Sequence, residues 1–215
     1  MRSDDPSTRR IYRLLSGKAP IRRSLRLIPV LLFLPGPAAP GIFSQTETEL
    51  VRINTPYVQT PQEVVSAMLE LAHVTSEDTV YDLGCGDGRI AIAAARDYGA
   101  HAVGIDINPD RVRESMENAS KAGVTGLVEF IHKDFFDADL SHATVIAFYL
   151  LPEVNRELLP KLLRVLKPGT RIVSHAFDFG GWKPEQAVVV SGCKVFLWTV
   201  PVNTTDILAH HPKER

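Results

Sequence analysis

The chain has 215 residues, of which 45% are hydrophobic and 23% are charged, and its net charge is −1. This composition is ordinary for a soluble globular protein, and the length suits one domain with a full core and some additional chain. The near-neutral charge gives no support for a nucleic acid partner. Two cysteines, Cys85 and Cys193, are too few for a disulfide framework or a metal cluster, so no metal site is expected.

Charge is unevenly distributed along the chain. Residues 1–26 hold eight basic and two acidic residues, a net charge of +6, whereas the rest of the chain holds 16 basic and 23 acidic residues, a net charge of −7. An acidic body repels a phosphate backbone, so nucleic acid is not the expected partner.

The segments of the first 50 residues follow one another in the same order as those of a secretory signal peptide. The basic head is followed by the apolar stretch 27–34 and then by prolines and small residues at 35–40. Arg22 and Arg23 add a weak likeness to a twin-arginine signal. The apolar stretch is short and proline-rich for a membrane-spanning helix, although it could hold the chain at a membrane. The alternative is a start codon placed too far upstream, with a disordered head on a cytoplasmic protein.

Residues 54–200 alternate strand-like and helix-like segments, an order that predicts a mostly parallel sheet with helices on both faces. The expected elements are a helix opening at Thr60, strand 79–83, helix 89–98, strand 102–106, helix 108–122, strands 128–132 and 144–150, helix 152–166, strand 171–175, and apolar runs at 186–190 and 194–200. The expected organisation is a head at 1–50, a single doubly wound α/β domain at 51–203 and a polar tail at 204–215.

Two local patterns refine these elements. Thr60 can cap the first helix, with Pro61 at its first position and Glu63 completing a capping box. Only the three residues 191–193 separate the last two apolar runs, and so short a connection predicts an antiparallel hairpin.

A glycine-rich turn follows the first strand and points to a cofactor. Gly84, Gly86 and Gly88 alternate with other residues there, and such a turn allows the backbone to approach a ligand closely. The dinucleotide pattern G-x-G-x-x-G would require glycine at the position of Arg89, which argues against a nicotinamide oxidoreductase. Asp82 precedes the turn. An acid there can bind the ammonium of an amino-acid-bearing cofactor, whereas it would repel a pyrophosphate.

Two more acids follow the next two strands. Asp106 ends the second strand, where an acid accepts hydrogen bonds from ribose hydroxyls. Asp134 follows the third strand, where it can accept from an adenine amino group while Phe135 supplies apolar cover. The carboxyl ends of parallel strands meet at one edge of the sheet, so Asp82, Asp106 and Asp134 should lie along one crevice. Together they predict a cofactor that carries an amino acid, a ribose and an adenine.

The stretches VYDLGCGDGRIAIAAA, VGIDINP, HKDFF and LKPGT resemble the class I S-adenosylmethionine-dependent methyltransferases, from about Pro56 to Pro201. Within that class the chain is similar to small bacterial methyltransferases of undefined substrate and to the mitochondrial protein lysine methyltransferases. The resemblance implies a Rossmann-like sheet of seven strands, with the last strand inserted between its neighbours.

The resemblance also implies site residues. The expected cofactor-binding residues are Tyr57, Thr60, Asp82, Gly84, Gly86, Asp106, Asp134 and Phe135. By analogy the end of the fourth strand faces the methyl group, which makes Tyr149, Glu153 and Asn155 candidates for orienting the nucleophile. That segment only loosely resembles the acid- or amide-Pro-Pro-Tyr motif of amine-methylating enzymes.

The expected activity is displacement of the methyl group onto an acceptor nucleophile, with a protein lysine favoured modestly. No insertion between strands is large enough for a lid, and an open site suits a tail or loop of a larger molecule. The alternatives are a small-molecule methyltransferase and a non-catalytic module that binds S-adenosylmethionine. A damaged glycine turn or a missing Asp106 would favour the module, and both features are intact. Because the cofactor is made inside cells, an exported enzyme would lack it.

Overall fold

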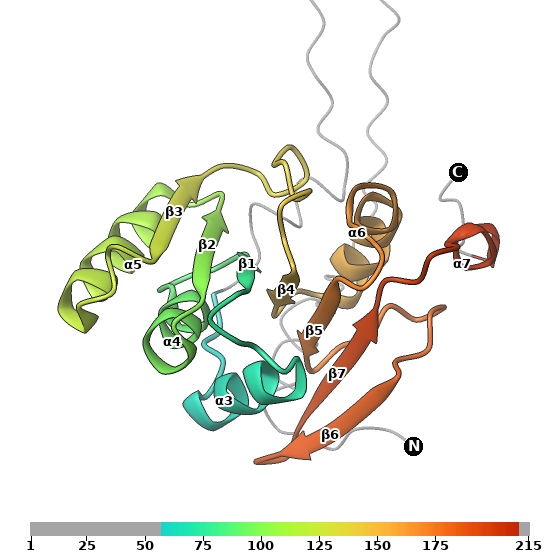
Figure 1. The fold of residues 1–215 in the computed structure, drawn as a ribbon, viewed down its shortest axis with the longest axis horizontal. Helices are drawn as coiled ribbons and strands as arrows, with labels where there is room; N and C mark the ends of the chain where they lie inside the picture. Colours follow the sequence, from blue (N-terminus) through green and yellow to red (C-terminus); the bar gives the residue numbers. More distant parts are fainter. Residues whose placement is uncertain (1–56, 211–215) are drawn as a thin grey trace, which may run out of the picture. The chain divides into compact units, whose positions relative to one another are not determined.

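The computed structural model describes residues 57–210, which form a seven-stranded sheet with helices on both faces (Figure 1). The strands are β1 (Thr79–Leu83), β2 (His101–Asp106), β3 (Val128–His132), β4 (Val145–Phe148), β5 (Arg171–His175), β6 (Gln186–Val190) and β7 (Cys193–Thr199). The helices are α3 (Gln62–Leu71), α4 (Arg89–Tyr98), α5 (Pro109–Ala122), α6 (Pro152–Val165) and α7 (Thr205–His210). The predicted head, with its signal-like and membrane-associating features, lies outside the described residues.

The order of strands is β3-β2-β1-β4-β5-β7-β6. Strands β1 to β5 are parallel, and β7 pairs antiparallel with both β5 and β6. The doubly wound α/β fold and the insertion of the last strand between its neighbours are therefore confirmed. The order reverses at β1 and β4, and in open α/β sheets such a switch point is where ligands bind.

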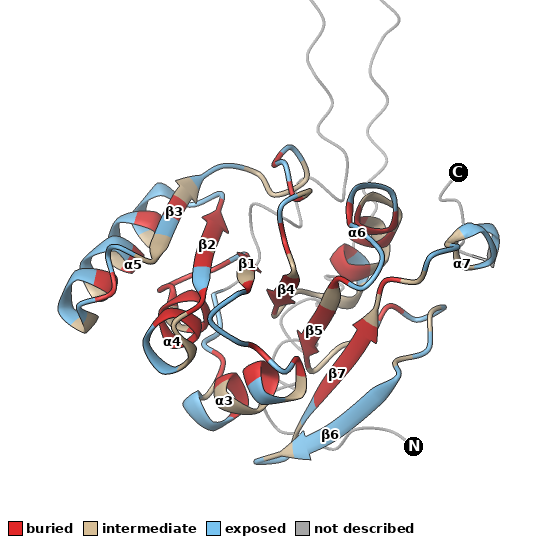
Figure 2. Cartoon of the chain, in the orientation of Figure 1, coloured by how far each residue is buried: buried red, intermediate tan, exposed pale blue. Residues whose placement is uncertain are grey.

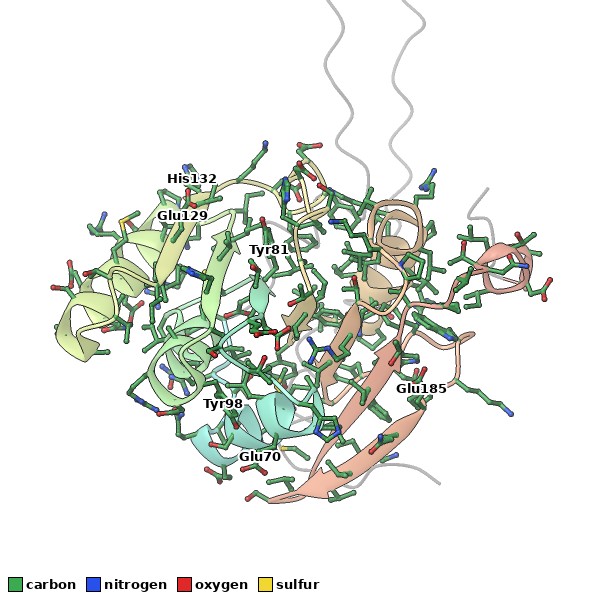
Figure 3. All side chains as sticks on the ribbon, viewed as in Figure 1. Glu70, Tyr81, Tyr98, Glu129, His132 and Glu185 are labelled. Carbon is green, nitrogen blue, oxygen red and sulfur yellow. The ribbon has the colours of Figure 1, made fainter. Side chains whose placement is uncertain are left out.

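Each face of the sheet has its own hydrophobic core. Helices α3, α4 and α5 cover one face, where residues such as Met68, Ile90 and Val112 pack with Val80 of β1. Helix α6 covers the other face, where Leu158 and Leu162 pack with β4 and β5. Figure 2 shows the central strands buried and the edge strand β6 exposed. At the opposite edge, Glu129 and His132 of β3 are exposed (Figure 3). None of the helices in residues 57–210 is long and apolar enough to span a membrane.

The start of α3 differs from the predicted capping box. The helix begins at Gln62, the residue before it is Pro61, and no side chain of the described residues caps it. The hydroxyl of Thr60 is instead 3.2 Å from Nδ1 of His175, at the end of β5. The prediction that Thr60 caps the helix is wrong because this hydroxyl is committed to a partner 115 residues away.

The hairpin at the end of the sheet uses a turn one residue shorter than predicted. Ser191 and Gly192 have φ values of 51° and 81°, and Cys193 already belongs to β7. Two successive positive φ values are typical of the type I′ turn, whose twist matches that of the strands. The predicted polar tail begins with α7, whose Ile207 and Leu208 pack against the core on the α6 face.

A partly buried ion pair between Asp78 and Arg171 links the amino ends of β1, β4 and β5. The carboxylate of Asp78 accepts hydrogen bonds from the hydroxyl of Thr144 at 2.7 Å, from the amide of Thr75 at 2.8 Å and from the guanidinium of Arg171. Arg171 also donates to the carbonyl of Ala72 at 2.7 Å. Burial alone would raise the pKa of Asp78, but these hydrogen bonds outweigh it and lower the pKa below its ordinary value.

We expect Asp78→Asn to lower the free energy of unfolding by about 2 kcal/mol at pH 7, because it leaves the guanidinium of Arg171 without its charged partner. The folded-state pKa of Asp78 is depressed, so its stabilisation is present above the unfolded pKa near 4 and is lost as the pH falls through the folded pKa. Urea unfolding of the original protein and of Asp78→Asn should therefore show a difference in the free energy of unfolding that becomes smaller below pH 4. An equal difference at pH 7 and pH 3 would contradict this account.

Candidate functional site

A cavity opens at the carboxyl edge of the sheet, at the switch point between β1 and β4. Its walls come from the ends of β1, β2 and β4, from the β3–β4 connection, from the start of α6 and from the segment 57–60. Seven of the eight predicted cofactor-binding residues line it: Tyr57, Thr60, Asp82, Gly84, Asp106, Asp134 and Phe135. The eighth, Gly86, lies directly under the ring of Tyr57.

The glycine turn leaves no room for side chains on the cavity side. Gly84 and Gly86 have φ values of 72° and 56°, a region that favours glycine. A Cβ atom on Gly86 would lie 2.3 Å from the ring of Tyr57, and one on Gly84 would lie 3.0 Å from Leu150. The glycines therefore allow Tyr57 and Leu150 to pack directly against the backbone of the turn, and Gly84, Cys85 and Asp87 of the turn line the cavity.

Asp106 ties the end of β2 to this turn. One carboxylate oxygen accepts a hydrogen bond from the amide of Gly86 at 2.8 Å, and the other accepts from the amide of Asn108 at 2.8 Å. The amides of Gly84 and Cys85 also donate to the carbonyl of Ile105, at 2.8 and 3.0 Å. The carboxylate is thus held in one orientation at the cavity wall. Each of its oxygens keeps a lone pair that can accept a further hydrogen bond, for example from a hydroxyl group.

Asp82 is the most deeply buried acid of the site, with 1% of its surface exposed. Its Oδ2 atom has no hydrogen-bond partner among the described residues. Burial, reinforced by the negative charge of Asp106, raises the pKa of Asp82 to about 8. An ammonium group in the cavity would supply the missing partner, so this acid fits the amino-acid end of S-adenosylmethionine.

The segment 57–60 is fastened over the glycine turn by Arg89. The guanidinium of Arg89 donates to the carbonyl of Thr60 at 2.7 Å and pairs with Asp87 at 2.5 Å. The guanidinium of Arg111, on α5, lies 4.9 Å from the centre of the Tyr57 ring. Neither arginine was predicted as a site residue from the sequence, although Arg89 directly follows the glycine turn.

The structure separates the three candidates for orienting a nucleophile. Tyr149 lines the cavity, and its ring centre lies 3.9 Å from that of His175, which is buried. Glu153 is exposed and pairs with Arg156 at 3.2 Å. Asn155 is fully buried and donates to the carbonyl of Phe177 at 3.1 Å. Of the three, only Tyr149 is among the cavity-lining residues.

Comparison with known proteins gives consistent matches. Residues 82–186 match the family described as the ANTKMT methyltransferase domain. Over 138 residues the chain is 51% identical to a protein-lysine N-methyltransferase of Saccharolobus islandicus, covering 64% of this chain and 86% of that protein. It is 28% identical over 179 residues to the adenine nucleotide translocase lysine N-methyltransferase of Mus musculus, covering 75% of this chain and 78% of the mouse protein.

A solved structure is also similar along most of its length. The crystal structure of an RNA methyltransferase from Salinibacter ruber, in complex with S-adenosyl-L-homocysteine, is 53% identical with a TM-score of 0.67. The match covers 68% of this chain and 95% of that one.

Proposed function

This chain belongs to the class I S-adenosylmethionine-dependent methyltransferases, and we propose that its acceptor is the side-chain amine of a protein lysine. The observation that carries the proposal is the 51% identity to the Saccharolobus protein-lysine N-methyltransferase over 86% of that protein's length. The net charge of −7 beyond residue 26 supports it, because an acidic surface attracts a cationic lysine segment.

The positions of the acids suggest how the cofactor is held. Asp82 would pair with the ammonium of the methionine part, Asp106 would accept from the ribose hydroxyls, and Asp134 with Phe135 would bind the adenine. With the adenosine held by residues after β2 and β3, the methionine part would extend toward β4. Supporting this arrangement, the strand register sets Leu83 of β1 beside Phe148 of β4, so Gly84 and Tyr149 leave the sheet next to each other.

The acceptor would then enter beside Tyr149. When bound, the cofactor supplies a methyl group on a sulfonium centre, which a neutral amine can attack. Tyr149, Leu150 and Val154 form a mostly apolar wall that would limit the access of water and keep the amine aligned. A lysine must reach the site without its proton, and the hydroxyl of Tyr149 is the polar group of this wall that could orient the lone pair.

An RNA acceptor is the second candidate, because the similar Salinibacter structure is described as an RNA methyltransferase. The acidic balance of the chain beyond residue 26 argues against it, since binding to RNA depends largely on neutralising phosphates.

The acceptor class can be tested with methyl-labelled S-adenosylmethionine. We expect label to enter protein and to be recovered as methylated lysine after hydrolysis when the enzyme is incubated with cellular protein, and not to enter total RNA supplied in parallel. The control is Asp106→Ala, with its folding confirmed by a cooperative thermal transition. Label in RNA alone would overturn the lysine proposal and leave the methyltransferase assignment intact.

A further inference from the structure

The connection between β3 and β4 carries two cavity residues without a helix to support them. It spans residues 133–144 and consists of turns and bends, so β3 passes to β4 directly (Figure 1). Ala138 and Leu140 are buried and anchor its second half. Asp134 and Phe135, which line the cavity, stand before that anchor.

The first turn of this connection is only partly held by its own hydrogen bonds. The carboxylate of Asp134 accepts from the amide of Phe136 at 2.8 Å, and the amide of Asp137 donates to the carbonyl of Asp134 at 2.9 Å. Within the turn the carbonyl of Asp134 is thus paired, and that of Phe135 accepts a long bond of 3.4 Å from the amide of Ala138. Stronger donors to the carbonyl groups come from outside the turn, and buried backbone oxygens are costly to leave unpaired.

Lys161 supplies those donors from the facing helix α6. Its ammonium donates to the carbonyls of Phe135 at 2.8 Å, Phe136 at 2.6 Å and Ala138 at 2.6 Å. A lysine ammonium has three N–H donors, so all of them are used on this one turn. Burial lowers the pKa of Lys161, while the neighbouring Asp137 and Asp134 favour its charged form. Charge-assisted bonds of this kind are stronger than those between neutral groups.

We infer that Lys161 is a positioning residue for the adenine end of the cofactor, holding Asp134 and Phe135 at the cavity wall from behind. This inference rests on the adenine-binding roles proposed above for those two residues. Lys161 itself is not among the residues that line the cavity, so it acts through the turn. A pre-organised turn does not have to be ordered on binding, and this raises affinity without a new contact.

The experiment compares two ligands that differ by the adenine. S-adenosylhomocysteine contains it, and S-ribosylhomocysteine lacks it while keeping the ribose and the amino acid. We expect Lys161→Met to raise the dissociation constant of S-adenosylhomocysteine by about tenfold or more and to leave that of S-ribosylhomocysteine within about twofold. Equal losses for both ligands, or no loss for either, would overturn the inference. The matched control is Lys167→Met, at an exposed lysine just beyond α6.

Two further arms keep the outcome interpretable. Phe135→Ala should also reduce the preference for S-adenosylhomocysteine over S-ribosylhomocysteine. An unchanged preference in this variant would refute the assignment of Phe135 to adenine binding. A reduced preference in Phe135→Ala together with an unchanged one in Lys161→Met would refute only the role of Lys161. If Lys161→Met does not fold, Lys161→Gln serves in its place, and hydrogen exchange at residues 134–138 should be faster in that variant than in the original protein. Unchanged exchange there would count against the inference.

Discussion

Replacing Asp82 by asparagine is expected to stabilise the ligand-free protein and to weaken its binding of S-adenosylhomocysteine. The carboxyl group of Asp82 is buried, one of its oxygens lacks a partner within residues 57–210, and its pKa is raised to about 8. At neutral pH the folded protein must therefore keep this group protonated, whereas in the unfolded chain it ionises near pH 4. Asparagine has nearly the same shape and carries no such penalty.

The sign of the effect follows from proton binding. Between about pH 4 and pH 8 the folded state binds one more proton at Asp82 than the unfolded state does, so the stability of the original protein falls as the pH rises. The Asp82→Asn variant lacks this dependence. We expect it to be more stable by about 3 kcal/mol at pH 7 and by much less at pH 5. Urea unfolding at the two pH values measures the difference.

The same change should lower affinity on the order of 100-fold, because it removes the charge that would pair with the ammonium of the ligand. Titration calorimetry with S-adenosylhomocysteine measures this loss. Asp97→Asn, at an exposed acid of α4, should alter neither quantity by more than about 0.5 kcal/mol. Equal pH dependence of stability in the two proteins would contradict the raised pKa of Asp82, and an unchanged affinity would contradict the ammonium site.

Asp82 costs stability in the ligand-free protein but is expected to bind the ligand. Residues of this kind can be recognised in a sequence, and they predicted the position of the cofactor site. A charged residue at the carboxyl end of a buried strand contributes little to a core. Asp82 and Asp106 stood out in the sequence for that reason, and the strand order brings them to one edge. The strands and most helices were predictable because their apolar periodicity and their Gly, Pro and Asn boundaries agree. Asn108, for example, caps α5 as its position before Pro109 suggests.

Contacts between side chains far apart in the sequence were not predictable in this way. The partner of Thr60 is His175, and Lys161 bonds a turn more than twenty residues before it. Such pairs depend on how the helices pack against the sheet, which local sequence patterns do not determine. Asn155 shows the same limit on a smaller scale. Its neighbour Val154 lines the cavity, but successive residues of a helix point about 100° apart, so Asn155 faces the loop after β5.

The second large effect is expected from Gly104→Ala in β2. A Cβ atom at this position would lie 2.5 Å from the ring of Phe130 on the neighbouring strand and 3.0 Å from Cβ of Cys85. The Phe130 ring cannot move aside easily, because it is buried and a Cβ atom on Gly88 would also lie 2.7 Å from it. The ring thus fills the space that two glycines leave between β2 and the start of α4.

We expect Gly104→Ala to lower the free energy of unfolding by about 3 kcal/mol, since overpacking a rigid core displaces side chains and backbone. Phe130→Leu alone should cost about 1–2 kcal/mol through the space it leaves. If steric conflict with the ring is the cause, the double variant should be at least about 1 kcal/mol more stable than the sum of the two losses predicts. Gly126→Ala, where a Cβ atom would meet nothing within 4 Å, is the control and should change stability by less than about 0.5 kcal/mol. Strict additivity in urea unfolding would show that Gly104 is needed for some reason other than the packing of Phe130 against the glycine turn.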